Sequence, residues 1–225
     1  MTSRRPPVIT IDGPSGSGKG TIAHRVAKAL GWHLLASGAL YRLVALAAGK
    51  AGVSFEDEVR LAELAGTLDV RFDSHPDGAE RIWLDGEDVT GEVRTEETGA
   101  GASAVAAIPA VREALLERQR AFQQAPGQVA DVRDIATHVF AEAPHKISLT
   151  ASAEERARRR HKQLKHKGMD VSLAALSRDI EDRDRRDTER SVAPLRPAED
   201  ARILDSSGQS IEAVTRTILD WVAEL

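Results

Sequence analysis

The sequence contains no cysteine, few aromatic residues and no long hydrophobic run. The absence of cysteine excludes disulfides, thiolate metal sites and a cysteine nucleophile, and it fits a reducing cytoplasm. No stretch approaches the roughly 20 apolar residues of a membrane-spanning helix, and no apolar signal-peptide core follows the N-terminal arginines. The formal net charge is −4, so no overall basic field recruits nucleic acid or an acidic membrane surface. We therefore expect a cytoplasmic protein.

Most of the chain alternates between short apolar segments and longer amphipathic ones. Its 225 residues, 41% hydrophobic and 29% charged, suit one compact globular unit with insertions. Strands are predicted at 7–11, 32–36, 127–132, 145–151 and 201–205. Helices are predicted at 22–30, 37–50, 54–66, 108–122, 152–168, 170–190 and 210–225. Ser54 is the expected N-cap of the third helix, and Pro109 marks the start of the fourth. This alternation indicates an α/β fold with a central, mainly parallel sheet that helices cover on both faces, a three-layer sandwich.

The pattern changes between residues 68 and 91. The segments "LDVRF", "RIWLDG" and "EDVTG" are short and are separated by turn residues, which predicts a small antiparallel sheet. A hairpin cluster inside a chain of alternating strands and helices indicates an insertion into the core fold.

The segment "IDGPSGSGKGT" at 11–21 lies between the first predicted strand and the first predicted helix. Its glycines let backbone N–H groups approach an anion closely, and the helix directs its positive N-terminal end at the same anion. Lys19 adds a charge for the β- and γ-phosphates, and the Thr21 hydroxyl suits Mg²⁺. Gly20 separates these two residues, which departs from the strict phosphate-loop pattern. The loop is therefore predicted to hold a nucleoside triphosphate through Gly13, Pro14, Ser15, Gly16, Ser17, Gly18, Lys19, Gly20 and Thr21.

Three classes of protein use such a loop, namely GTPase switches, motor or DNA-handling ATPases, and small-molecule kinases. The Asn-Lys-x-Asp guanine reader of GTPases is absent from the sequence. A nucleic-acid ATPase needs a basic face with stacking aromatics, whereas aromatic residues make up only 4% of this chain. The sequence therefore favours a kinase.

Two predicted helices in the last third of the chain carry arginines at helical spacing. Arginine suits phosphate because its planar guanidinium can donate two parallel hydrogen bonds. The residues that share a face at this spacing are Arg156, Arg159 and Arg160 on one helix and Arg183, Asp187 and Arg190 on the next. Gly168 separates the helices, and a kinase must exclude water during transfer, so we interpret them as a closing lid. The run "EDRDRRD" by itself is interpreted as a network of surface ion pairs at i, i+4 spacing.

The segment "VADVRD" places Asp131, Arg133 and Asp134 at the end of an apolar strand. In a parallel sheet, the C-terminal strand ends line the ligand crevice. An arginine there can bind phosphate, and a carboxylate can bind a base amine or, through water, a metal; the alternative is a turn ion pair. Spacing alone leaves Arg42 and Arg112 as surface residues.

Taken in order, these segments resemble the bacterial cytidylate kinase family of nucleoside monophosphate kinases. The resemblance covers most of the chain, and its most specific motifs are "SGALYR", "PAVREALL" and "RSVAPL". It implies transfer of the γ-phosphoryl of ATP to CMP or dCMP with Mg²⁺, by a monomer without a nucleic-acid or membrane partner. It also implies a P-loop core at 1–37, 109–155 and 191–225, a monophosphate-binding insertion at about 38–108 and a helical lid at about 156–190.

The resemblance further implies which residues bind each substrate. The implied catalytic residues are Lys19, Arg133 and Arg190, and the implied lid contacts to ATP are Arg156, Arg159 and Arg160. The implied CMP-binding residues are Ser37, Arg42, Arg133 and Arg190 at the phosphate, Ser103, Arg112 and Asp134 at the cytosine edge, and Arg183 and Asp187 at the ribose. A carboxylate can accept from the cytosine amine, whereas uracil would bring a carbonyl to the same carboxylate.

Four positions depart from the family pattern. Ala36 replaces an aspartate before "SGALYR", Val132 and Ala136 replace glycines, and His138 replaces a valine. The two lost glycines would crowd the acceptor phosphate or change the strand-end turn, and we interpret His138 as a tolerated packing substitution. The changes leave two alternatives open: a related phosphotransferase with another acceptor such as UMP, and a nucleotide-binding protein with reduced turnover.

Overall fold

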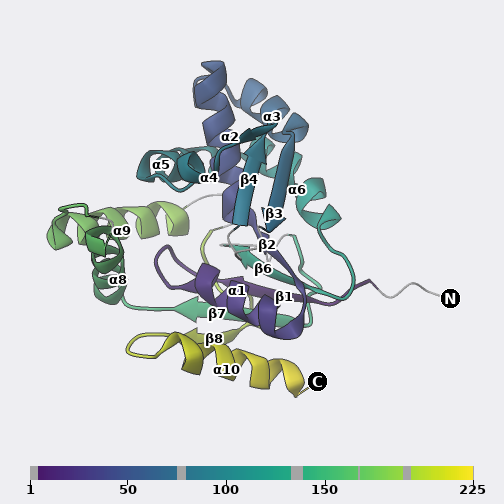
Figure 1. Cartoon of the computed structure of the whole chain (residues 1–225), viewed down its shortest axis with the longest axis vertical. Coiled ribbons are helices and arrows are strands. Elements are labelled where there is room, and N and C mark those ends of the chain that lie inside the picture. Colours follow the sequence, from purple (N-terminus) through teal and green to yellow (C-terminus); the bar gives the residue numbers. More distant parts are fainter. Residues whose placement is uncertain (1–4, 75–79, 133–138, 167, 190–193, 225) are drawn as a thin grey trace. The chain divides into compact units, whose positions relative to one another are not determined.

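The computed structural model describes residues 5–74, 80–132, 139–166, 168–189 and 194–224, and the chain forms two compact units. The first unit consists of residues 1–36 and 122–225, and the second consists of residues 37–121. Figure 1 shows a five-stranded sheet in the first unit and a bundle of helices with a small sheet in the second. The functional division into core, insertion and lid stays a prediction.

The first unit is built on a parallel sheet. Its strands are β1 (Val8–Asp12), β2 (His33–Ala36), β6 (Gln128–Val132), β7 (His145–Thr150) and β8 (Arg202–Asp205). Their order is β2-β6-β1-β7-β8, and every pair is parallel. All five residues of β1 are buried, which is typical of a parallel sheet covered on both faces. The predicted α/β fold with a central parallel sheet is therefore confirmed.

Two helices pack side by side on one face of this sheet (Figure 1). They are α1 (Lys19–Leu30) and α10 (Ile211–Ala223). Ile9 and Ile11 of β1, which are fully buried, belong to the same apolar cluster as Val26 and Ile218 of these helices. The burial of such β-branched side chains contributes about 1.5–3 kcal/mol each. This packing fixes the start of α1, and with it the loop that precedes α1.

The helices α8 (Ala153–His166) and α9 (Leu173–Glu189) follow β7 and pack against each other. Their boundaries agree with the two predicted arginine-bearing helices. Gly168, at the C-terminal end of α8, has a φ of 76°, and its N–H bonds the Lys165 carbonyl. The glycine therefore ends α8 as the sequence predicts.

The second unit contains five helices among its described residues, and α3 packs on α6 while α2 packs on α5. The helices are α2 (Ser37–Ala51), α3 (Glu58–Thr67), α4 (Thr90–Val93), α5 (Glu96–Val105) and α6 (Pro109–Ala121). Its antiparallel sheet consists of β3 (Val70–Ser74), β4 (Glu80–Leu84) and β5 (Glu87–Asp88). The predicted small antiparallel sheet is confirmed.

Two details of the second unit differ from the sequence predictions. Ser54 is not the N-cap of α3, because the Asp57 side chain accepts from the Arg60 N–H at 3.1 Å, while Ser54 Oγ accepts from the Glu56 N–H in the preceding turn. The helices α4 and α5 were not predicted. Glycines at 99 and 101 weaken the helical pattern of α5, although Thr95 caps it by accepting from the Thr98 N–H.

No single helix among the described residues is long and apolar enough to cross a membrane. The pair α5 and α6, which meet at an angle of 102°, passes the same test of length and composition only when taken together.

Candidate functional site: the phosphate loop and its arginines

The loop between β1 and α1 begins at a point of close backbone contact. Gly13 has a φ of 153°, and a Cβ on it would lie 2.1 Å from the backbone oxygen of Leu149 in β7. Only glycine can occupy this position without moving a central strand. The loop ends at Gly18, the N-cap of α1, which has a φ of 90°. The first turn of α1 therefore starts directly at Lys19, with its unbonded N–H groups at the loop.

Arg156 of α8 is buried and holds the outer side of this loop. Its Nη1 donates to the Ser15 carbonyl at 2.9 Å, and its Nε donates to the Ala151 carbonyl at 3.0 Å. The same guanidinium forms a two-point ion pair with Asp184 of α9. Only 4% of the Arg156 side chain is exposed. One arginine thus connects the loop, α8 and α9.

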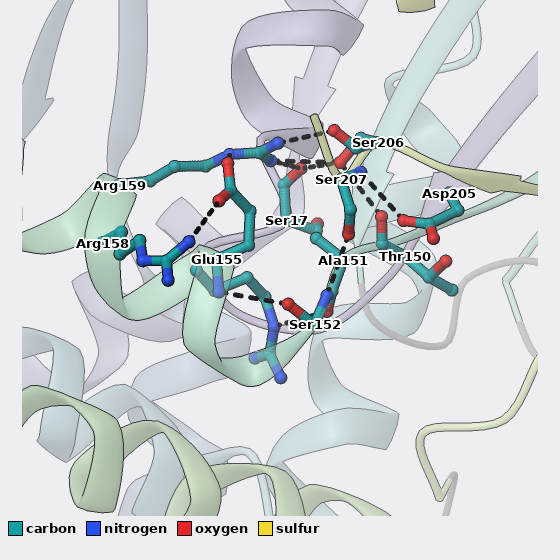
Figure 2. A network of polar contacts seen from close by, with 11 residues as sticks. Ser17, Thr150, Ala151, Ser152, Glu155, Arg158, Arg159, Asp205, Ser206 and Ser207 are labelled. Atoms are coloured by element: carbon teal, nitrogen blue, oxygen red, sulfur yellow. Dashed lines mark hydrogen bonds and ion pairs between the residues drawn. The ribbon is translucent and has the colours of Figure 1, made fainter. Parts of the chain in front are cut away.

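Arg159, about one turn further along α8, bonds the loop at the Ser17 carbonyl, two residues after the carbonyl that Arg156 bonds (Figure 2). Its Nη1 donates to the Ser17 carbonyl at 3.2 Å and to Ser206 Oγ at 3.0 Å, and its Nη2 donates to the Ser206 carbonyl at 2.6 Å. Glu155 accepts from its Nε at 3.1 Å. Sequence reasoning placed Arg156 and Arg159 on one helical face, and the structure brings both to the phosphate loop. Their predicted contact to ATP phosphates stays a prediction.

Arg160, the third predicted lid arginine, donates from Nη1 to Gln163 Oε1 at 3.3 Å. Burial lowers the pKa of its guanidinium below the usual value. Desolvation of a cation leaves it more responsive to an incoming anion than a fully hydrated one, although arginine stays protonated at neutral pH.

The residues predicted on α9 occupy different environments. Asp187 is buried, and its backbone carbonyl accepts from the Leu195 N–H at 2.8 Å, while Arg183 is half-buried. The predicted surface network in "EDRDRRD" includes an Arg185–Asp182 ion pair at 2.7 Å, with i, i+3 spacing instead of the predicted i, i+4. Asp184 pairs with Arg156 of α8 instead of joining this surface network. The position of Asp184 within "EDRDRRD" did not indicate this pairing.

In the second unit, two predicted acceptor-site arginines hold the ends of helices. Arg42 Nη1 donates to the carbonyls of Val93 at 2.8 Å and Thr95 at 2.9 Å, so it joins the end of α4 to the start of α5. A Cβ on Gly99 would lie 2.7 Å from Arg42 Nη2, so this glycine makes room for the guanidinium.

Arg112 lies at the junction of α5 and α6. Its Nη1 donates to the Ala106 carbonyl at 3.2 Å, and its guanidinium carbon lies 5.9 Å from the centroid of the Tyr41 ring. Ser103 is half-buried in α5, on the same helix that Ala106 caps. Ser37, the first residue of α2, is fully buried, and its Oγ bonds no other described atom.

The similarity of the chain to known proteins covers both units. The cytidylate kinase family model matches residues 9–224. A cytidylate kinase of Stutzerimonas stutzeri (strain A1501) is 61% identical over 219 residues, which cover 97% of this chain and 96% of that protein. A cytidylate kinase of Pseudomonas paraeruginosa (strain DSM 24068 / PA7) is 60% identical over 217 residues, which cover 95% of this chain and 93% of that protein.

The chain belongs to the cytidylate kinase family. It is therefore a P-loop kinase, and the resemblance drawn from the sequence is confirmed. This family membership leaves the role of each residue in the site as a prediction.

Mg²⁺, which the family implies, fits the oxygen atoms beside the loop. Thr21 lies in the first turn of α1, and a Cβ on Gly20 would lie 3.0 Å from Asp131 Oδ2 at the end of β6. Gly20, the departure from the strict loop pattern, thus leaves space for a carboxylate. No group of three or more His, Asp or Glu side chains in the described part of the chain could hold a metal alone. A hydroxyl and a carboxylate suit Mg²⁺, which is commonly bound by few protein ligands together with substrate phosphates.

Several predicted residues lie outside the described part of the chain. These are Arg133, Asp134, Arg190 and the family departures Ala136 and His138. Of the other two departures, Val132 is the last residue of β6, and Ala36 is the last residue of β2. Ala36 is the sheet neighbour of Asp131. The Asp131 carboxylate of β6 is therefore next to the strand position at which Ala36 replaces the aspartate of the family pattern.

Sequence reasoning missed Ser206, which follows β8. Its hydroxyl is buried and contacts the Ser17 carbonyl at 3.2 Å and the Thr150 carbonyl at 3.0 Å. Ser206 and Ser17 are 189 positions apart in the chain, so no local pattern could have indicated their contact.

Proposed function

We propose that the protein transfers the γ-phosphoryl of ATP to CMP or dCMP and releases ADP with CDP or dCDP. The observation that carries this proposal is the similarity to cytidylate kinases, about 60% identical over nearly the whole chain. The geometry agrees with it, because a glycine loop on a buried strand leads into a helix N-terminus.

The donor phosphates belong at the loop of residues 13–21. Lys19 Nζ contacts the Pro14 carbonyl at 3.4 Å, a long hydrogen bond that a phosphate oxygen can replace. Thr21, with Asp131 through water, would hold Mg²⁺, which when bound neutralises the β- and γ-phosphate oxygens. Arg160 is assigned as a lid contact to the triphosphate of ATP.

The acceptor phosphate is assigned to Ser37, Arg42, Arg133 and Arg190. A buried hydroxyl such as that of Ser37 gains a hydrogen bond when a phosphate oxygen reaches it. The ribose is assigned to Arg183 and Asp187.

The base is assigned to Ser103, Arg112 and Asp134. Cytosine presents an amine donor, which a carboxylate and a serine oxygen accept, and an unprotonated ring nitrogen, which an arginine can reach. Uracil would place a carbonyl against the Asp134 carboxylate, so two acceptors would face each other without a proton between them. Buried polar mismatches of this kind give strong discrimination.

The chemical step needs positioning and charge stabilisation, and no covalent intermediate. The reacting oxygens must be held in line, and cationic side chains must neutralise the charge on the transferred group. Lys19, Arg133 and Arg190 are the residues that we assign to this role.

Neither alternative is favoured. Another acceptor, or a nucleotide-binding protein with reduced turnover, would be motivated by Ala36, Val132 and Ala136, but the similarity to cytidylate kinases extends over nearly the whole chain. A monomer in the cytoplasm, a core of residues 1–37, 109–155 and 191–225, an insertion at 38–108 and a lid at 156–190 belong to the same proposal.

The test is the initial rate of ADP release from Mg-ATP with CMP, dCMP, UMP, AMP and GMP, each at one concentration. We expect high rates with CMP and dCMP and low rates with the others. The variant K19M should lose nearly all activity with CMP, while K28M, on the exposed last turn of α1, should match the wild type. Preference for another acceptor would overturn the proposal, as would the absence of ADP with every acceptor.

A further inference from the structure

We infer that Arg159 and Ser206 are positioning residues for ATP, which orient the phosphate loop by holding its Ser17 carbonyl from the outside. The inference rests on the proposed function only in taking the ligand of the loop to be the triphosphate of ATP. It gives Arg159 a different role from the direct phosphate contact that the sequence indicates, and it gives a role to Ser206, which the sequence does not indicate.

The contact is built from buried, mutually bonded groups. Ser17 is 1% exposed and Ser206 is 3% exposed. The Ser17 carbonyl accepts from Arg159 Nη1 at 3.2 Å, and it shares the single Ser206 hydroxyl proton, at 3.2 Å, with the Thr150 carbonyl at 3.0 Å. The backbone of Ser206 is itself fixed to β7, because its N–H donates to the Thr150 carbonyl at 2.8 Å. The carbonyl is thus tied both to α8 and to the central sheet.

Holding a carbonyl outward aims the next N–H inward. In a planar trans peptide the C=O and the following N–H point in opposite directions, and the peptide between Ser17 and Gly18 is trans. The Gly18 N–H therefore points away from Arg159 and Ser206, toward the side on which the loop would enclose an anion. Arg156 acts in the same way two residues earlier in the loop, because it holds the Ser15 carbonyl and so directs the Gly16 N–H.

The charge of Arg159 is already matched. Glu155 accepts from Arg159 Nε at 3.1 Å, and the three other bonds of the guanidinium go to Ser17 and Ser206 (Figure 2). A guanidinium that is paired with a carboxylate and uses its other donors on the protein has little left for a phosphate. Its planar fork is what the arrangement requires, because it reaches two neighbouring oxygens at once.

The test measures binding of Mg-ATP, of inorganic tripolyphosphate and of CMP by calorimetry in the variants S206A and R159K. Lysine keeps the charge of Arg159 but cannot bond Ser17 and Ser206 with the same geometry. We expect both variants to bind Mg-ATP and tripolyphosphate about three- to tenfold more weakly, the loss that one hydrogen bond represents, and to bind CMP like the wild type. The double variant should lose less than the product of the two single losses, because both act on one carbonyl.

Two neighbouring variants serve as matched controls. S207A removes a hydroxyl from the same turn, one that accepts from the Ser152 N–H and does not contact the loop. R158K changes an arginine on the same helix whose side chain is 61% exposed and paired with Glu154. Both should bind all three ligands like the wild type.

Three results would overturn the inference. The first is an S206A variant that binds Mg-ATP normally while R159K does not, since Arg159 would then act directly on phosphate. The second is equal weakening for CMP and Mg-ATP together with a lower melting temperature, which indicates a merely structural role. The third is normal binding by both variants. Because these binding measurements need no acceptor turnover, failure of the proposed function would appear separately, as absence of ADP release with CMP in the wild type.

Discussion

Gly13 of the phosphate loop and Gly99 of α5 each lie close to another residue, but the nearest atoms of those residues differ in how far they can move. A Cβ on Gly13 would meet the backbone oxygen of Leu149 in a central strand, at 2.1 Å. A Cβ on Gly99 would meet Nη2 of Arg42, the end of a long side chain, at 2.7 Å. The loop is therefore fitted to the rigid sheet, whereas the Arg42 contact in the second unit is adjustable. We therefore expect an alanine at Gly13 to cost much stability, and an alanine at Gly99 to weaken chiefly the binding of one substrate.

The largest effect is expected for G13A. The methyl group must displace either the loop or β7, so we expect a loss of about 3 kcal/mol in the free energy of unfolding and no detectable binding of Mg-ATP. Urea unfolding and calorimetry measure these quantities. G31A is the matched control, because Gly31 has a φ of 66° but nothing lies within 4 Å of its added Cβ. G31A should lose only about 1 kcal/mol and should still bind Mg-ATP. Equal losses in the two variants would contradict the close contact at Leu149.

A smaller and more selective effect is expected for G99A. The methyl group would push the Arg42 guanidinium away from the carbonyls of Val93 and Thr95, which it now bonds. Under the proposed function, the KM for CMP should rise about tenfold, while the KM for Mg-ATP should stay unchanged. Steady-state kinetics with each substrate varied in turn would measure both. A rise in the KM for ATP alone would show that Arg42 does not serve the acceptor.

The substitution G49A places an alanine in a helix at a position where the added methyl group meets no neighbouring atom, unlike G99A. Gly49 lies in α2 with nothing within 4 Å of an added Cβ. We expect G49A to raise the free energy of unfolding by about 0.5–1 kcal/mol, because alanine favours the helix. Urea unfolding would measure the change. A loss of stability in G49A would contradict the open space around this position.

The smallest effect concerns the first residue of β7, the strand that provides the Leu149 oxygen. Burial, with a lesser contribution from the Arg202 charge, lowers the pKa of His145 below its usual value of 6.5. The unfolded chain therefore binds more protons near this pH, so His145 contributes stability above pH 6.5 that is lost as the pH falls toward its lower folded-state pKa. In H145Q, the free energy of unfolding should fall less steeply between pH 7 and pH 5 than in the wild type. Parallel slopes would contradict the lowered pKa.

The sequence was most informative where one local pattern has one structural solution. An apolar strand, a glycine loop and an amphipathic helix predicted β1, the phosphate loop and α1, and the turn residues around "RIWLDG" predicted the small sheet. The helix α5 was missed because a Cβ on Gly101 would lie 3.0 Å from Ala45 and from Phe55, and the glycines that permit this packing also lower the helical signal.

The site could be predicted as residue types but not as contacts. Helical spacing placed Arg156 and Arg159 on one face, yet it could not show that they bond loop carbonyls 141 and 142 positions away. Ser54 and Asp57 are both suitable N-cap residues by type, and the helix α3 begins after Asp57, three residues later than predicted. Such outcomes depend on distances in space that spacing along the chain does not contain.

The most direct test of the account is the ratio of kcat/KM for CMP to kcat/KM for UMP in the unmodified protein, with Mg-ATP saturating. The proposed assignment of the base to Ser103, Arg112 and Asp134 predicts a ratio of about a hundred or more, because uracil would bring a carbonyl to the Asp134 carboxylate. A ratio near one, or a preference for UMP, would contradict the proposed acceptor and the roles given to these residues.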